Sequence, residues 1–360
     1  MSELFYQTVF GKGDLLTSII EKNFEEKNVI DLVSVAAYKK DSELIKRIYE
    51  TTTTEEAENF LLLDELIFYL AYFDDGIEIL EKIYEVTQNS KLKLEIISSI
   101  TEINREKGIE YIKEYITSDD LANLSIGIYL IDRFNVIELK KELLELMNRQ
   151  MLEDLKYQAL FTLGKLKYDK ILPLLLKGAV NKNDQQLLYI ESIKNFDDDK
   201  TRNILLKEAK RMFQDKLIKL KLAQIIYSYN KDVSNSIFSK FIKSKKLDIQ
   251  GFTIELIASL KNDKFIPEVN EIFQSPQAFN KANAIMYFRK VNYSSKLNEL
   301  KEFYFSDSAN MNMKEEILKF VSELDKDSNS VKEFTDKLPK EDQKILLKNI
   351  IDTSLKQRNV

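Results

Sequence analysis

Eight apolar residues recur along the chain at intervals of 30 to 33 residues, and this period constrains the fold more than any other feature of the sequence. These residues, which we call the anchors, are Ile100, Ile131, Leu163, Ile193, Ile226, Ile257, Phe288 and Val321. The positions three residues before and three residues after each anchor are also apolar or tyrosine. An i, i+3, i+6 stripe of this kind is one buried face of a helix. Because only 44% of the chain is apolar, the pattern predicts eight helices that bury equivalent faces.

A second amphipathic segment follows most anchor stripes after a short polar turn, as at residues 139–147 and 171–179. Each unit is therefore expected to be a helical hairpin of about 31 residues, which cannot bury its stripe without a stacked neighbour. The 8 Gly and 4 Pro of the chain are too few to punctuate a large β protein. The sequence thus predicts an all-α fold, a right-handed α-solenoid of about 8–10 short hairpins.

The best-formed unit carries a known motif. Leu155 and Lys156 are followed by two spacers, Ala159, three spacers, Leu163 and Gly164. This order resembles the second helix of a HEAT repeat, and the resemblance covers residues 90–325. The period is shorter than the ~40 residues usual for HEAT repeats and is similar to that of short bacterial HEAT-like units. The resemblance implies that the second helices line a concave surface, which in solenoids binds partners.

The regularity of the repeat divides the chain into three segments of one continuous solenoid. We expect irregular helical repeats and a cap over residues 1–88, regular HEAT-like repeats over 89–330, and capping helices over 331–360. Apolar residues at 66–73 fit one further unit, about 30 residues before Ile100. End units that cover the terminal core are expected of a solenoid.

Composition narrows the function. The chain has no cysteine and no histidine, which removes the thiol nucleophile, thiolate metal sites and the usual general base near neutral pH. We therefore predict no catalytic residues, no metal site, no cofactor and no enzyme activity. The N-terminus lacks the basic region of a signal peptide, and no apolar run is long enough to span a membrane. The prediction is a cytoplasmic protein without a membrane span.

Five lysines stand at one repeat position, seven residues before an anchor. They are Lys93, Lys156, Lys219, Lys281 and Lys314. Such a column could follow a phosphate backbone. Seven residues correspond to almost two full turns, however, so these side chains lie near the buried stripe. We favour a structural role at the seam between repeats, where the ammonium groups reach turn carboxylates or helix-terminal carbonyls.

The positions five before, two before and two after each anchor point away from the buried stripe, and there we predict the partner-binding site. The candidate residues, all apolar or basic, are Ile126, Tyr129, Arg133, Phe161, Lys165, Leu188, Lys221, Phe252, Met286 and Lys290. Exposed aromatic residues and Met among basic residues are typical of an interface core. A one-residue error in the register would instead make the apolar members ordinary core.

Three functions are compatible with these observations. The leading prediction is a non-enzymatic scaffold or adaptor that binds a segment or an amphipathic, partly acidic helix of a protein partner in its concave groove. The first alternative is a nucleic-acid-binding protein similar to the HEAT-like alkylpurine glycosylases, against which the net charge of −5 and the absence of Trp argue. The second is an enzyme similar to the HEAT-like lyases, for which the sequence shows no paired catalytic groups.

Overall fold

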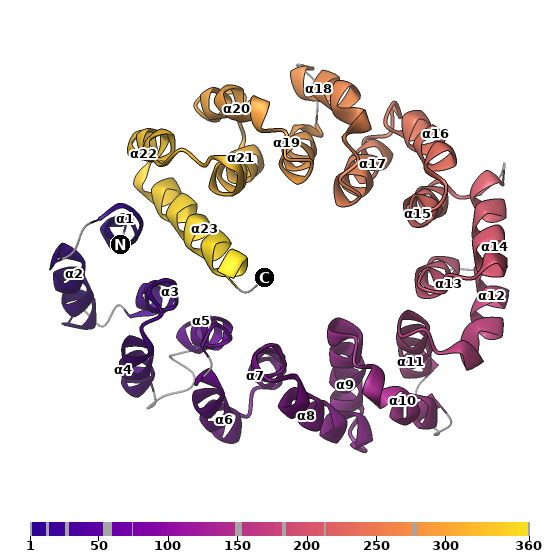
Figure 1. The fold of residues 1–360 in the computed structure, drawn as a ribbon, viewed down its shortest axis with the longest axis horizontal. Helices are drawn as coiled ribbons and strands as arrows, with labels where there is room; N and C mark the ends of the chain where they lie inside the picture. The colour runs from indigo at the N-terminus through magenta and orange to yellow at the C-terminus, as the bar shows by residue number, and fades with distance from the viewer. Residues whose placement is uncertain are drawn as a thin grey trace. The chain divides into compact units, whose positions relative to one another are not determined.

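A computed structural model describes residues 2–11, 14–25, 29–52, 60–73, 75–147, 153–181, 185–211, 214–275 and 279–358. Within these ranges the regular secondary structure consists of 23 α-helices and four short 3-10 helices, with no strand, so the predicted all-α fold is confirmed (Figure 1). The handedness of the solenoid stays a prediction. No helix of these ranges is long and apolar enough to cross a membrane. The chain forms two compact units: unit 1 comprises residues 1–108 and 292–360, and unit 2 comprises residues 109–291.

Unit 2 consists of two layers of helices that alternate along the chain (Figure 1). The first layer holds the helices that carry the anchors, and each packs against the next. These anchor helices are α9 (Leu121–Phe134), α11 (Glu153–Lys165), α13 (Gln186–Ile193), α15 (Lys216–Ile226), α17 (Leu247–Ser259) and α19 (Lys281–Lys290). The second layer is formed by most of α8 (Arg105–Thr117) and by α10 (Lys140–Met147), α12 (Leu172–Val180), α14 (Asp199–Lys210), α16 (Lys231–Phe241) and α18 (Ile266–Gln274).

The predicted stripe is the core of the repeats. All eight anchors have no exposed surface, and every residue three positions before an anchor is buried. Three positions after the anchor only Leu166 and Phe196 are buried, and the other six residues are half-buried. Each fully buried Leu, Ile or Phe of the stripe contributes about 1.5–3 kcal/mol to stability, so the register of the repeat is strongly determined.

Several anchor helices end in the same way, with a left-handed residue four positions after the anchor. These residues are Asn135, Lys167, Lys261 and Asn292, with φ between 50° and 56°. At three of them the next amide, as that of Tyr168, donates to the anchor carbonyl, which closes the helix end as in a Schellman motif. Lys40, with φ 57°, ends α3 in the same geometry.

Unit 1 contains both ends of the chain. From the N-terminal side it holds α1 (Ser2–Phe10), α2 (Asp14–Glu25), α3 (Ile30–Lys39), α4 (Ser42–Thr52), α5 (Phe60–Leu70), α6 (Gly76–Val86) and α7 (Ser90–Ile103). From the C-terminal side it holds α20 (Leu297–Tyr304), α21 (Met311–Leu324), α22 (Ser328–Lys337) and α23 (Lys340–Arg358).

The N-terminal repeats are more regular than their sequence indicates. Ala36 and Ile67 are fully buried and stand three residues before the ends of α3 and α5, as Ile100 does in α7. They continue the spacing of the anchors at 31 and 33 residues. The apolar residues at 66–73 indicate the unit at Ile67, but the column of apolar residues is interrupted because Ala36 is small and because the polar Asp64 occupies the position three residues before Ile67.

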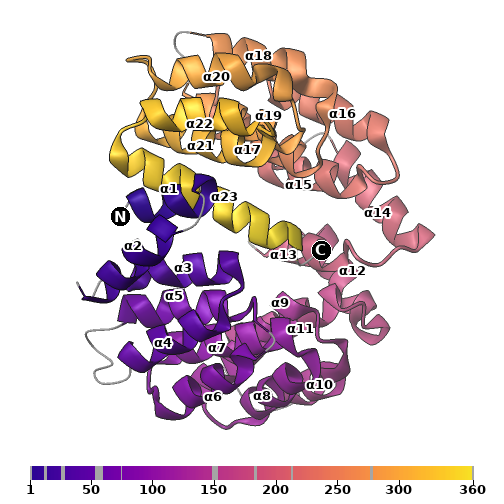
Figure 2. The same ribbon diagram turned by 60° about the vertical axis from the view of Figure 1, so that its left-hand side comes forward.

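The C-terminal helix α23 packs against α21 and also against α1 and α3 of the N-terminal end (Figures 1 and 2). Leu346, Leu347 and Ile351 have no exposed surface, and Leu355 is buried with them. The sequence predicts capping segments at both ends, and in the structure the two ends share the core of unit 1.

The lysine column lies against neighbouring helices rather than in open solvent. Three of the five lysines place Nζ 5.1 to 5.9 Å from the ring centroid of an aromatic residue on the preceding helix: Lys93 on Tyr84, Lys281 on Phe273 and Lys314 on Tyr304. Lys219 Nζ donates to the Arg211 carbonyl at the end of α14, at 3.1 Å. These are cation–π contacts and a helix-terminal hydrogen bond, and they support the structural interpretation.

Candidate functional site

A groove of about 730 Å³ lies on the anchor helices α9, α11 and α13 of unit 2. We call it the α9–α11–α13 groove. Its lining combines aromatic, aliphatic and charged side chains: Ser125, Ile128, Tyr129, Asp132, Asp154, Tyr157, Gln158, Phe161, Thr162, Lys165, Gln185, Leu188, Glu191, Ser192 and Lys194. Its volume is in the range of protein ligand sites.

The groove unites four of the ten residues predicted to bind a partner, namely Tyr129, Phe161, Lys165 and Leu188. The other six also lie on anchor helices of unit 2 but do not line the groove: Ile126 and Arg133 on α9, Lys221 on α15, Phe252 on α17, and Met286 and Lys290 on α19. The groove therefore includes only part of the predicted partner-binding surface.

The apolar part of the groove has a rigid floor and two exposed side chains. Phe161 is only 9% exposed. Tyr157 stacks on it with ring centroids 6.0 Å apart, and Tyr189 meets it edge-on at 5.1 Å. Tyr129 and Leu188, by contrast, are 50% and 49% exposed. Phe161 therefore belongs largely to the core, whereas Tyr129 and Leu188 present apolar surface to solvent.

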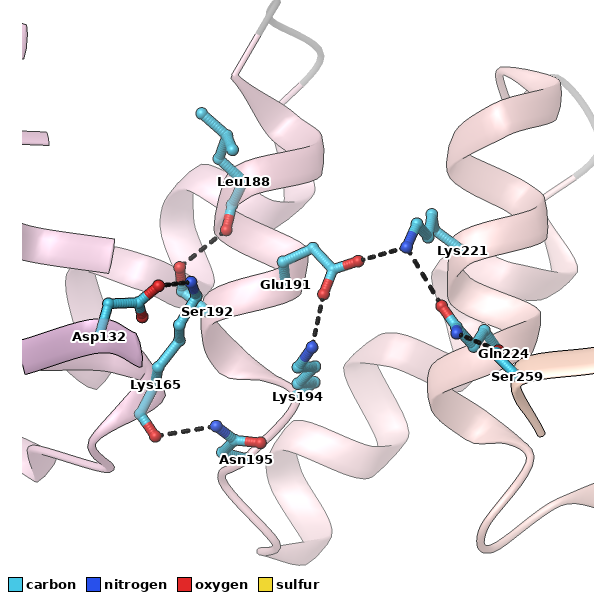
Figure 3. A network of polar contacts seen from close by, with 10 residues as sticks. All are labelled: Asp132, Lys165, Leu188, Glu191, Ser192, Lys194, Asn195, Lys221, Gln224 and Ser259. Atoms are coloured by element: carbon cyan, nitrogen blue, oxygen red, sulfur yellow. Dashed lines mark hydrogen bonds and ion pairs between the residues drawn. The ribbon is translucent and has the colours of Figure 1, made fainter. Parts of the chain in front are cut away.

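A network of polar contacts links the three helices α9, α11 and α13 (Figure 3). Lys165 Nζ contacts Asp132 Oδ2 at 2.5 Å, which joins α11 to α9. Asn195 Nδ2, just after α13, donates to the Lys165 carbonyl at 2.8 Å. The second Asp132 oxygen, Oδ1, is enclosed and accepts no hydrogen bond from any residue that the structure describes. The charge of Lys165 is thus offset within the protein.

The network continues from α13 to α15 and α17. Glu191 accepts hydrogen bonds from Lys194 at 2.7 Å and Lys221 at 2.9 Å, and Gln224 donates to Ser259 at 2.9 Å (Figure 3). Burial acts to raise the pKa of Glu191, but the hydrogen bonds from the two lysines outweigh burial and hold that pKa below its usual value. Glu191 therefore stays charged at neutral pH, and Lys221 is engaged in holding neighbouring repeats together.

Residues at two further repeat positions line the groove and were not selected from the sequence. Asp132 and Lys194 stand directly after an anchor, and Ser125 and Tyr157 stand six residues before one. The face turned to the groove is therefore a wider arc of each helix than the three positions considered. The i, i+4 spacing of Tyr157 and Phe161 was a usable signal, since such residues are neighbours on a helix.

Most of the charged groups of the groove have partners within the protein. Asp132 and Glu191 are engaged by lysines, and the nearby carboxylate of Glu153 raises the pKa of Tyr157, so this phenol keeps its proton. In the described parts of the chain, no group of three or more acidic residues could hold a metal ion.

A second hollow, of about 740 Å³, lies beside the C-terminal end of α14 in the other layer of unit 2. Lys207, Lys210 and Arg211 line it, but cations at this end of a helix offset the helix dipole. Arg211 also contacts Glu208 at 3.1 Å. These residues therefore have a structural explanation.

Comparison with known proteins adds no assignment, because no family model and no curated protein matches the chain.

Proposed function

We propose that the protein is a non-enzymatic scaffold or adaptor that holds a segment of a partner protein in the α9–α11–α13 groove. The observation that carries the proposal is the half exposure of Tyr129 and Leu188 beside the ordered floor formed by Phe161. Aromatic side chains such as Tyr129 are enriched in interface cores and hot spots, and Leu188 adds apolar surface to the same groove.

The energetics support a binding role. Burying the exposed halves of Tyr129 and Leu188 under a partner would contribute about 1 kcal/mol each. The surrounding ion pairs hold Lys165 and Glu191 in place before any partner arrives, so binding orders few side chains. Such preorganisation reduces the entropic cost of association.

The charge of the groove indicates what kind of contact dominates. Two of the four basic residues predicted to bind a partner, Lys165 and Lys221, are each paired with a carboxylate of the neighbouring helix. We therefore expect apolar contact to supply most of the affinity, and the affinity to change little with ionic strength.

The test is affinity capture from a lysate of the source organism with three forms of the protein. These are the wild type, the double variant Tyr129→Ser/Leu188→Ser, and the control variant Leu174→Ser. Leu174 is 48% exposed and lies on α12, so it matches Leu188 in exposure but lies outside the groove.

A protein captured by the wild type and by Leu174→Ser, but reduced at least tenfold with the double variant, would support the proposal. Equal capture by the double variant would contradict it. Circular dichroism must show that all three forms remain folded.

A further inference from the structure

Unit 1 shows how these repeats bind a helix. Three residues of α23, spaced four apart on one side of the helix, contact α3 and α5. Lys344 Nζ contacts Asp31 at 2.8 Å, Lys348 Nζ contacts Glu65 at 2.5 Å, and the Tyr69 hydroxyl donates to Asp352 at 2.7 Å. Helix α23 therefore lies across two successive repeats, with a polar stripe directed at them.

The three residues of α3 and α5 that α23 contacts occupy the repeat positions predicted to face a ligand. Asp31 stands five residues before Ala36, and Glu65 and Tyr69 stand two residues before and two residues after Ile67. Ala36 and Ile67 are the fully buried residues that continue the anchor spacing. Within this chain, then, the ligand-facing positions of the repeat bind an α-helix.

The equivalent positions in α9 and α11 have a different chemistry. Five before the anchor of α9 stands Ile126, and two before and two after the anchor of α11 stand Phe161 and Lys165. Where α3 and α5 have two acidic residues, α9 and α11 have two apolar residues. Where α5 has a tyrosine, α11 has a lysine. A helix seated as α23 is would meet Ile126 on α9 with its first side chain. Its second side chain would meet the Phe161 floor of the groove, which the half-exposed Tyr129 also lines, and its third would meet the ammonium of Lys165.

Lys165 can bind a carboxylate of a partner helix while it keeps its ion pair with Asp132. An ammonium group has three donors, and the described contact of Lys165 Nζ with Asp132 Oδ2 uses one of them. A partner carboxylate can therefore share Lys165, and a charge-assisted hydrogen bond of this kind fixes the register of a bound helix more than it adds affinity.

We propose that the α9–α11–α13 groove binds an amphipathic α-helix of a partner protein, with apolar side chains at positions i and i+4 and a carboxylate at i+8. The inference rests on the proposed function and specifies its ligand. The polar stripe of α23, with Lys344, Lys348 and Asp352, gives the spacing, and the residues of α9 and α11 give the chemistry.

The probe is a synthetic, fluorescein-labelled peptide with the sequence of α23, 19 residues long. The matched peptide carries Lys344→Leu and Lys348→Leu, and the control peptide keeps both lysines. Both carry Ile345→Lys, joined to Glu341 by a lactam that holds the helix. Glu341 and Ile345 are exposed in α23. Binding to the full-length protein is measured by fluorescence anisotropy.

The matched peptide is expected to bind at least tenfold more tightly than the control peptide. It should lose at least tenfold in affinity for the Tyr129→Ser/Leu188→Ser protein, and several-fold when its own carboxylate is removed by Asp352→Asn. Equal affinity of the two peptides would overturn the inference, as would binding that the groove substitutions leave unchanged.

The two proposals fail separately. If capture of a partner depends on the groove while the matched peptide does not bind, the ligand is not a helix of this pattern and the proposed function stands. If capture is also independent of the groove, both proposals fall.

Discussion

Two substitutions on helix α13, Ile193→Ala and Leu188→Ala, test the register of the repeat. Both remove three carbon atoms. Ile193 has no exposed surface, whereas Leu188 is about half exposed. At about 0.8 kcal/mol per buried carbon, the change at Ile193 forfeits about 2.4 kcal/mol, and the cavity it leaves raises the loss to about 3–4 kcal/mol. At Leu188 the same change forfeits about 1 kcal/mol and leaves no cavity.

The free energy of unfolding of each variant is measured by urea titration, followed by far-ultraviolet circular dichroism. We expect the free energy of unfolding to fall by at least about 2 kcal/mol more in Ile193→Ala than in Leu188→Ala. The dependence of this free energy on urea concentration should be similar in both variants. A shift of the register by one residue would turn Leu188 toward the core. Equal losses, or a larger loss at Leu188, would therefore refute the assignment of the groove face.

Three further predictions concern other parts of the structure. Lys261→Gly should raise the free energy of unfolding by about 0.5 kcal/mol, because the left-handed backbone of Lys261 costs more than the added chain entropy of glycine; a lower urea midpoint would contradict the helix-end geometry. Burial raises the pKa of Tyr229 to about 12, so the stability it contributes is complete below pH 10 and is lost as pH rises from about 10 to 12. Tyr229→Phe should reduce the loss of unfolding free energy between pH 10 and 12, measured by urea titration. An equal loss in the wild type and the variant would contradict the burial of the Tyr229 hydroxyl. Lys344→Met should destabilise the protein by about 3 kcal/mol, because it leaves the buried carboxylate of Asp31 without its cation; the added change Asp31→Asn should restore at least half of this, and no recovery in urea titrations would contradict the pairing.

The repeat was predictable because its signal is local and repeated. A helix that buries one face must place apolar residues at i, i+3 and i+6, and eight units averaged out the exceptions. The signal is weaker at α3 and α5, although the apolar residues at 66–73 indicate one further unit. There the small Ala36 and the polar Asp64 break the column, although Ala36 and Ile67 are fully buried.

The packing of α23 on the N-terminal helices was not predictable from the same pattern. The contacts of Lys344 with Asp31 and of Asp352 with Tyr69 join residues about 300 positions apart. Periodicity shows which face of a helix is buried but not which distant helix covers it. The sequence therefore indicated caps at both ends without indicating that the ends share a core.

The candidate site was predicted in part. The positions five before, two before and two after each anchor were sufficient to select Tyr129 and Leu188, which are exposed in the groove. They could not show that Lys165 and Lys221 are paired with Asp132 and Glu191, because these pairs depend on how neighbouring repeats stack. We therefore propose that apolar contact, rather than the predicted basic residues, supplies most of the affinity of the groove.

Site-specific photo-crosslinking tests the central claim most directly. A benzophenone amino acid replaces Tyr129 in one protein and Leu174 in another, and each is irradiated with the captured partner. We predict an adduct from position 129 and none from position 174, with the crosslinked partner segment carrying apolar residues at i and i+4 and a carboxylate at i+8. An adduct of equal yield at both positions, or none at position 129, would contradict the assignment of the groove as the binding face.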